Sequence, residues 1–278
     1  MESTSANEGI QNLSVDRAKE WLARNKESAF ILLDVRQPEE YRSCHLPGAV
    51  LIPLPSLMDK VGELDPAKSL LVYCRSGNRS RAAAVFLLSK GFSKVYSIDG
   101  GITAWNGRAA TGSYDEGLFL LKGRKTAEEL VSLALAFEEG SRMFYASVAE
   151  LTVDAEAKNI LNTIAEAEVK HKINILEAYK LITGEDFAED ILNREPLKRV
   201  MESGVRIEDA IIFLKEQGKT VLDILEVSMQ VETNAIDLYM KILRKIEDVN
   251  AKKVFDIIVE EEQHHLSELG QLLGGRVT

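Results

Sequence analysis

The chain has 278 residues, of which 45% are hydrophobic and 28% are charged, a globular composition that excludes a disordered or membrane-embedded chain. The net charge of −10 is unevenly distributed, because residues 1–110 hold 14 Lys and Arg against 12 Asp and Glu, whereas residues 111–278 hold 20 against 32. Nucleic-acid binding needs clustered cations, so we expect no nucleic-acid partner.

The two cysteines, Cys44 and Cys74, are too few for a disulfide framework or for a four-cysteine metal site. The first 14 residues are polar and lack the pattern of a secretory signal. No run approaches 18 uninterrupted apolar residues, the minimum for a membrane span. We therefore expect a cytoplasmic protein with no membrane partner.

Residues 14–108 alternate short apolar runs with helical stretches. Strands are predicted at 29–35, 50–54, 70–74 and 95–98, and helices at 15–25 and 80–90, the second ended by Gly91. Strands that alternate with helices predict an α/β domain with a largely parallel sheet. Glycines become frequent across 107–124, so we assign a first domain to 1–110 and a linker to 111–124.

Residues 125–278 predict long helices with a period of 3.6 residues. Thr126 and Glu129 form a capping box that begins the first helix. The long helices are expected at 126–151, 153–182, 220–245 and 250–273, with a break at Pro196 and a short amphipathic helix near 207–217. One long connection between the second and third helices predicts an all-α, ferritin-like four-helix bundle.

The helical half repeats itself at an offset of 94 residues. AFEEGSRMFY recurs as QVETNAIDLY, and AKNILNTIAEAEVKH recurs as AKKVFDIIVEEEQHH. Two helical hairpins of one design would pack together, so a site between them should be quasi-symmetric. The repeat pairs Glu138 with Glu232, Tyr145 with Tyr239, Glu168 with Glu262, and His171 with His265.

The repeated segments contain a pattern of metal ligands. A spacing of three residues puts the Glu and the His of each Glu-x-x-His on one helix face, and each of the other two long helices adds one Glu. A single Glu-x-x-His is usually a solvated helix face, but two copies at one offset favour a di-metal carboxylate site. Iron, manganese or a mixed pair would suit these ligands, which are Glu138, Glu168, His171, Glu232, Glu262 and His265.

Two tyrosines accompany these ligands. Tyr145 and Tyr239 each follow a ligand Glu by seven residues, which is two turns along the same face. They could donate hydrogen bonds to the ligands or serve as core aromatic residues, and both alternatives stay open.

Through these Glu-then-Tyr and Glu-x-x-His helices, residues 125–275 resemble the rubrerythrin branch of the ferritin-like superfamily. The resemblance implies two iron ions in a non-haem centre that reacts with hydrogen peroxide or dioxygen, in an oligomer of at least two chains. Many rubrerythrins receive electrons from a four-cysteine rubredoxin site that this chain lacks, so an unknown external reductant is expected. An extra carboxylate ligand of the family has no clear counterpart. Glu261 and His264 are near, and we expect them to be solvated or to support the ligands.

The segment Cys74-Arg-Ser-Gly-Asn-Arg79-Ser80 lies between an apolar strand and a helix. Converging backbone N–H groups and the helix N-terminus would favour a thiolate there, and Arg75 and Arg79 add positive charge. A reactive thiolate in an anion-binding loop is expected, with Ser76, Gly77, Asn78 and Ser80 around the anion. The alternatives are an inert cysteine in a turn and, within function, phosphate chemistry in place of sulfur chemistry.

Residues 12–108 resemble a single-domain rhodanese. The resemblance rests on Leu33-Asp-Val-Arg36, Glu39 or Glu40 before Tyr41, His45-Leu-Pro-Gly-Ala49, CRSGNRS, and Asp99-Gly-Gly-Ile102 before Trp105. In that family a six-residue loop, as from Cys74 to Arg79, accompanies sulfur transfer, and related phosphatases have one residue more. The resemblance implies attack of Cys74 on a sulfane sulfur such as that of thiosulfate, a persulfide, and transfer to a thiol or cyanide.

Three further residues of this half receive supporting assignments. Asp34 and Arg36 are expected to pair and to hold the loop. Cys44 replaces a glycine that is common in the family, and we expect a passive thiol although it could also resolve a persulfide as a disulfide with Cys74.

The leading functional hypothesis is a bifunctional enzyme, with rhodanese-type sulfur transfer and a di-iron oxidoreductase centre that reduces peroxide. Coupling, in which persulfides or thiols reduce the metals, is an additional hypothesis. The alternatives are a ferroxidase or iron-storage bundle, and a rhodanese half that senses sulfide or binds protein.

Overall fold

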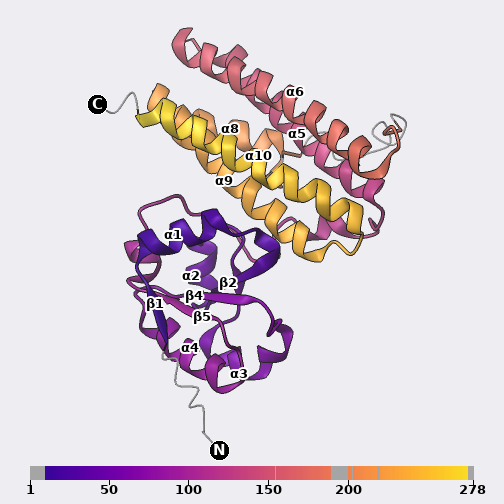
Figure 1. The fold of residues 1–278 in the computed structure, drawn as a ribbon. Helices are drawn as coiled ribbons and strands as arrows, with labels where there is room; N and C mark the ends of the chain where they lie inside the picture. The colour runs from indigo at the N-terminus through magenta and orange to yellow at the C-terminus, as the bar shows by residue number, and fades with distance from the viewer. Residues whose placement is uncertain (1–9, 154, 189–199, 202, 218–219, 275–278) are drawn as a thin grey trace, which may run out of the picture. The chain divides into compact units, whose positions relative to one another are not determined.

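The computed structural model describes residues 10–153, 155–188, 200–201, 203–217 and 220–274, and it divides into two compact units between Tyr114 and Asp115 (Figure 1). This boundary falls inside the segment 111–124 that was expected to be a linker. The Gly112 N–H donates to the Arg42 carbonyl in the first unit, whereas Leu120 is buried in the core of the second. The segment is therefore shared between the units.

The first unit is built on a parallel sheet, as predicted. Its described strands lie in the order β1-β5-β4-β2-β3, and all four pairings are parallel. The central strands β2 and β4 are apolar almost throughout because both of their faces are covered. The strands are β1 (Gln11–Leu13), β2 (Phe30–Asp34), β3 (Val50–Leu51), β4 (Ser69–Tyr73) and β5 (Val95–Ile98).

Helices cover both faces of this sheet, with α1 and α2 on one side and α3 and α4 on the other (Figure 1). Two apolar clusters fill the layers, one around Tyr41 and Leu71 and the other around Val72 and Leu87. The α/β prediction is confirmed. The helices are α1 (Val15–Arg24), α2 (Pro38–Ser43), α3 (Leu57–Lys60) and α4 (Asn78–Ser89), joined by the short 3₁₀ helices η1 (Glu27–Ala29), η2 (Leu54–Ser56), η3 (Val61–Glu63) and η4 (Gly101–Ala104).

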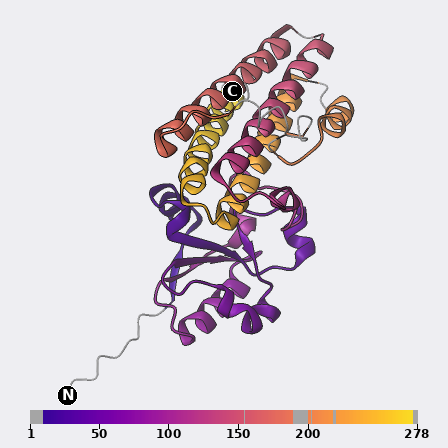
Figure 2. The same ribbon diagram turned by 90° about the vertical axis from the view of Figure 1, so that its right-hand side faces the viewer.

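The second unit is the predicted helical bundle, in which four long helices run side by side (Figure 2). Capping boxes begin two of them, Thr126 with Glu129 and Thr220 with Asp223. The expected break at Pro196 lies outside the described residues. The elements are η5 (Leu118–Leu121), α5 (Ala127–Leu151), α6 (Ala155–Thr183), α8 (Ile207–Gln217), α9 (Val221–Lys245) and α10 (Val249–Gly274). Among the described residues, none of the helices combines the length and the hydropathy that a membrane span requires.

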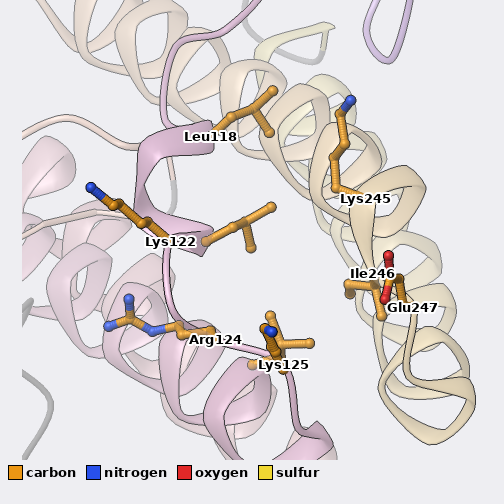
Figure 3. Close-up of a pocket in the computed structure, with 9 residues that line it drawn as sticks. Leu118, Lys122, Arg124, Lys125, Lys245, Ile246 and Glu247 are labelled. Carbon is orange, nitrogen blue, oxygen red and sulfur yellow. The ribbon is translucent and has the colours of Figure 1, made fainter.

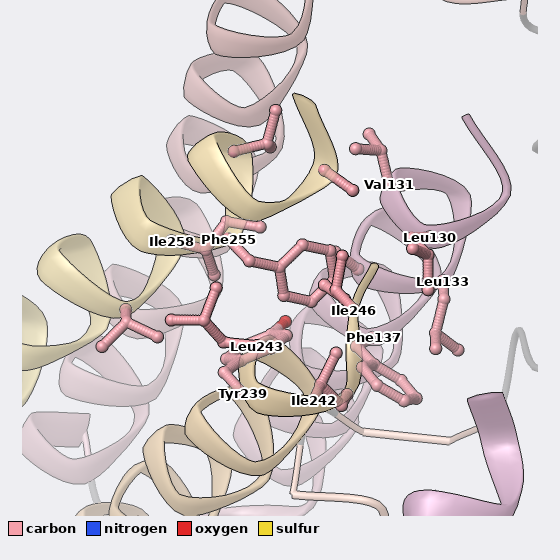
Figure 4. Close-up of a cluster of buried hydrophobic side chains, with 14 of the residues drawn as sticks. Leu130, Val131, Leu133, Phe137, Tyr239, Ile242, Leu243, Ile246, Phe255 and Ile258 are labelled. Atoms are coloured by element: carbon pink, nitrogen blue, oxygen red, sulfur yellow. The ribbon is translucent and has the colours of Figure 1, made fainter. Parts of the chain in front are cut away.

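Two apolar clusters form the core of the bundle, and the predicted metal ligands lie between them. One cluster, around Phe137, Tyr239 and Phe255, is shown in Figure 4; the other surrounds Phe144 and Leu225. On each of the four long helices, the ligand residues separate the members of one cluster from those of the other. Large apolar side chains contribute about 1.5–3 kcal/mol each when buried, so a polar layer is held inside a well-packed bundle.

Two candidate functional sites

The Cys74 loop follows the central strand β4, and a second loop fixes its backbone. The Ile102 N–H donates to the Cys74 carbonyl at 2.9 Å, and the Thr103 N–H donates to the Arg75 carbonyl at 3.0 Å. Gly101 allows this approach, because a Cβ there would lie 2.3 Å from the Cys74 carbonyl oxygen and its φ is +55°. The Asp99-Gly-Gly-Ile102 segment therefore acts as a clamp on the cysteine loop.

The Cys74 sulfur is buried and accepts a hydrogen bond from the Gly77 N–H at 3.1 Å. Burial alone would raise the pKa of the thiol, but the N–H groups of Ser80, Ser76 and Gly77 bring that pKa below its ordinary value. The Ser80 hydroxyl contacts the Gly77 carbonyl and the Ser97 hydroxyl, which ties the loop to β5. The arrangement favours a thiolate beside the N-terminus of α4.

The two arginines of the loop differ in their surroundings. Arg79 forms a two-pronged ion pair with Glu40, both N–O distances being 2.7 Å, and this contact lowers the pKa of Glu40 to about 2. The Arg75 side chain is exposed, and the described residues give it no hydrogen bond. Ser76 and Asn78 are also exposed at the surface of the loop.

Asp34 and Arg36 form a buried ion pair, in which the shortest N–O distance is 2.7 Å. The same guanidinium donates to the Cys44 carbonyl at 2.7 Å and lies 5.5 Å from the ring centroid of Tyr73, so it contacts the segment before His45 and the end of the strand that leads into the Cys74 loop. Burial would lower the pKa of Arg36, but Asp34 raises it. Cys44 and Cys74 are both free thiols, and Cys44 is half-buried.

The bundle brings the six predicted metal ligands together at its centre. Each is at most 9% exposed. Their ligand atoms form three groups, within each of which the atoms lie within 4.8 Å of one another, and Glu168, His171 and His265 each belong to two of these groups. The groups are Glu138 with Glu168 and His171, Glu168 with Glu232 and His265, and His171 with Glu262 and His265.

The buried ligand atoms are short of protein partners. His171 Nδ1 lies 3.1 Å from a Glu262 oxygen and 3.3 Å from a Glu138 oxygen without the geometry of a hydrogen bond. Every one of the six residues has at least one buried oxygen or nitrogen with no hydrogen-bond partner. Buried polar groups are normally paired, so this donor set fits two divalent cations, which would satisfy the converging atoms.

The pKa values of the ligand side chains also indicate a site for cations. Burial raises the pKa of Glu262 to about 8, and the nearby Glu138 carboxylate adds to the rise. Burial likewise raises the pKa of Glu168 well above its usual range. Burial opposes the charged form of His171, but its carboxylate neighbours raise the pKa of the imidazole. Four carboxylates gathered in one buried layer repel one another, and bound cations would offset that repulsion.

The two tyrosines cross between the helical hairpins. The Tyr145 hydroxyl on α5 donates to Glu232 on α9 at 2.5 Å, and the Tyr239 hydroxyl on α9 donates to Glu138 on α5 at 2.8 Å. Both tyrosines are fully buried. They are thus core aromatic residues and hydrogen-bond donors to the ligand carboxylates at once.

The spare acidic and imidazole residues lie at the edge of this centre. Glu261 accepts a hydrogen bond from the Asn174 side chain at 2.9 Å, and His264 is exposed. A separate cavity of about 500 Å³ lies between η5 and the C-terminal end of α9. The charged ends of Lys122 and Arg124 point away from Leu118 (Figure 3). Glu247 is the one carboxylate in the described lining, which has no histidine or cysteine, so the cavity gathers no comparable set of ligands.

Comparisons with known proteins find matches to both halves of the chain. A rhodanese-like domain family matches residues 14–108, and the rubrerythrin family matches residues 129–273. Thiosulfate sulfurtransferases GlpE from Pseudomonas syringae pv. syringae and Pseudomonas savastanoi pv. phaseolicola are 42% and 40% identical over 80 residues, 29% of this chain and 76% of each relative. A rhodanese-like domain protein from Staphylococcus aureus has 25% identity and a TM-score of 0.34, and the match covers 37% of this chain and 100% of that one.

Proposed function

Because this chain belongs to the rubrerythrin family and joins that domain to a rhodanese-like sulfurtransferase domain, we propose that it transfers sulfane sulfur at Cys74 and reduces hydrogen peroxide at a di-iron centre. The observation that carries the proposal is the layer of six buried ligands with unpartnered atoms, in the same chain as a hydrogen-bonded reactive thiol.

In the proposed sulfur transfer, the Cys74 thiolate attacks the sulfane sulfur of thiosulfate. A new S–S bond forms as the old S–S bond breaks, and sulfite leaves with the electron pair. A cyanide or thiolate acceptor then attacks the outer sulfur of the persulfide, and the Cys74 thiolate is released. The N–H groups of Ser76, Gly77 and Ser80, which lower the pKa of the thiol, would stabilise the negative charge at both stages.

In the proposed metal centre, Glu138 and His171 would hold one iron, and Glu232 and His265 the other. Glu168 groups with both of these pairs, and Glu262, its counterpart in the repeat, would take the same role. When bound, the two irons would supply the two electrons that peroxide reduction to water requires. Tyr145 and Tyr239 orient the terminal carboxylates by hydrogen bonds. An external reductant would restore the electrons.

Metal analysis of wild type and of Glu168→Ala/Glu262→Ala tests the bundle. We expect about two irons per wild-type chain, their loss in the variant, and a peroxide-dependent absorbance change only in wild type. Oxidation of added Fe²⁺ by dioxygen with no peroxide turnover would favour a ferroxidase instead. Absence of iron after reconstitution would overturn the di-iron assignment.

Sulfur transfer is tested by thiocyanate formation from thiosulfate and cyanide. Wild type should form a persulfide that mass spectrometry assigns to Cys74, with an added mass of one sulfur atom. A protein that forms no persulfide with thiosulfate or with low-molecular-weight persulfides would instead support a binding or sensing role for this domain.

A further inference from the structure

A cavity of about 510 Å³ opens between α6 and α10 and reaches the metal ligands. The rings of His171 and His265 form part of its wall. Its remaining polar lining comes from the same two helices and includes Lys170, Glu261 and His264. The cavity therefore joins the ligand layer to the surface on the histidine side of the centre.

The exposure of the ligands shows that this side is the open one. Glu138, Glu168 and Glu232 are 0% exposed, whereas His265 is 5% and His171 is 9% exposed. The Nδ1 atoms of both histidines are themselves buried and have no hydrogen-bond partner, so they remain available to an ion. Among the described residues, solvent thus approaches the ligand set from the histidines, and the carboxylates are covered by the protein.

The two copies of the internal repeat differ at the outer lining of this cavity. At the offset of 94 residues, His171 corresponds to His265, Lys170 to His264, and Ala167 to Glu261, and all six line the cavity. The ligand histidines are thus repeated, but the outer positions are not. Glu261 adds a carboxylate where the other half has a methyl group, and Asn174 on α6 holds one of its oxygens at 2.9 Å.

Building on the proposed di-iron function, we propose that this cavity is the port through which divalent metal ions load the centre, with Glu261 as the transit ligand at its mouth. Carboxylate and imidazole groups are ligands for such ions, and Glu260 adds a second negative charge to the lining. Lys170 opposes entry because it has the same sign of charge as the ion. Glu261 therefore attracts an entering cation, and Lys170 repels it.

The test measures metal uptake by the full-length, metal-free protein, using Co²⁺ alone and its visible absorbance in a stopped-flow instrument. Glu261→Gln should slow uptake by roughly three- to tenfold, and Lys170→Gln should accelerate it by about twofold, because each changes the charge that the ion meets. Both should still bind the wild-type number of ions. Glu150→Gln, at an exposed position on α5, makes the same charge change as Glu261→Gln and should leave the rate unaltered.

The outcomes separate the port from the metal centre itself. Equal rates for Glu261→Gln and Glu150→Gln would overturn the port, as would a lower final stoichiometry in Glu261→Gln, which would make Glu261 part of the ligand set. Opposite shifts for Glu261→Gln and Lys170→Gln, reduced by added salt, would support it. If wild type takes up no Co²⁺ and no Fe²⁺ at all, the proposed di-iron function fails as well.

Discussion

The two candidate sites use different parts of the polypeptide for the same task, the stabilisation of negative charge inside a protein. At Cys74, the backbone N–H groups of one loop surround a single sulfur. In the bundle, side chains from four helices bring four carboxylates together with unpartnered atoms. The N–H dipoles of the loop stabilise the thiolate without any bound ion, whereas the four buried carboxylates of the bundle would need bound cations to offset their mutual repulsion.

This difference predicts that the sites can be broken separately, and Cys74→Ser should give the largest effect. Loss of the nucleophile should lower sulfur transfer by at least about a thousandfold, with bound iron unchanged. Cys44→Ser is the matched control and should keep both properties. A Cys74→Ser protein that also loses iron would show that the two sites depend on each other.

Metal removal is the converse experiment, and it should affect only the bundle. Bound ions stabilise the folded form by about 4 kcal/mol when free metal exceeds its dissociation constant a thousandfold, so chelation should lower the unfolding temperature of the bundle. The chain has two tryptophans, Trp21 and Trp105, and both belong to the first unit. Tryptophan fluorescence therefore follows that unit, while helical circular dichroism is dominated by the bundle. A matching shift in both signals would contradict independent sites.

The tyrosines test whether the two halves of the bundle centre are equivalent. Tyr145→Phe and Tyr239→Phe each remove one hydroxyl donor from a ligand carboxylate, and each should weaken metal binding by roughly 10- to 100-fold. Tyr179→Phe, in the apolar cluster of α6, removes a hydroxyl elsewhere and should have little effect on affinity. Competition with a chelator of known affinity measures all three. A loss in only one of the two ligand-side variants would show that the repeat is not functionally symmetric.

The sequence predicts the bundle well because its signals are local or repeated. Helix α8 was expected at 207–217 and spans Ile207–Gln217, and the long helices differ from expectation by at most two residues. Helical spacing fixes the face of each ligand, and the repeat shows which glutamates correspond. The hydrogen bonds of Tyr145 to Glu232 and of Tyr239 to Glu138 are seen only in the structure. They join α5 to α9, and contacts between two helices do not follow from the sequence of either helix alone.

The first unit was predicted less completely, for a physical reason. Strand β1 has three residues, pairs with β5, and carries too little apolar pattern to be recognised. The Glu40–Arg79 pair joins residues 39 positions apart, and Gly101 clamps a loop that precedes it in the chain. Such contacts join segments that are distant in the chain, and the path of the chain decides which residues meet. The motifs therefore predicted a structured loop without identifying the residue pairs that hold it.

The smallest expected effect concerns the fine balance of charge around Cys74. Because loop N–H groups lower the pKa of this thiol, its alkylation by iodoacetamide should reach half of its maximal rate below pH 9, the ordinary value for a thiol. Glu40 neutralises Arg79, and its pKa of about 2 keeps it ionised throughout this range. Glu40→Gln should therefore expose more of the Arg79 charge to the thiolate and move the midpoint down by a few tenths of a pH unit.

Glu39→Gln is the matched control, since it removes an exposed carboxylate from the adjacent position. The Glu40–Arg79 pair is about one-third exposed, so solvent screens it and its loss should reduce stability by about 1 kcal/mol or less. An upward shift in Glu40→Gln would mean that Glu40 acts by orienting Arg79 toward the sulfur, and that removing this orientation outweighs the gain in free charge. Equal shifts in both variants would instead show that the net charge of the domain sets the effect of Glu40. The pKa of Cys74 would then depend on distant charges as well as on the N–H groups of its own loop.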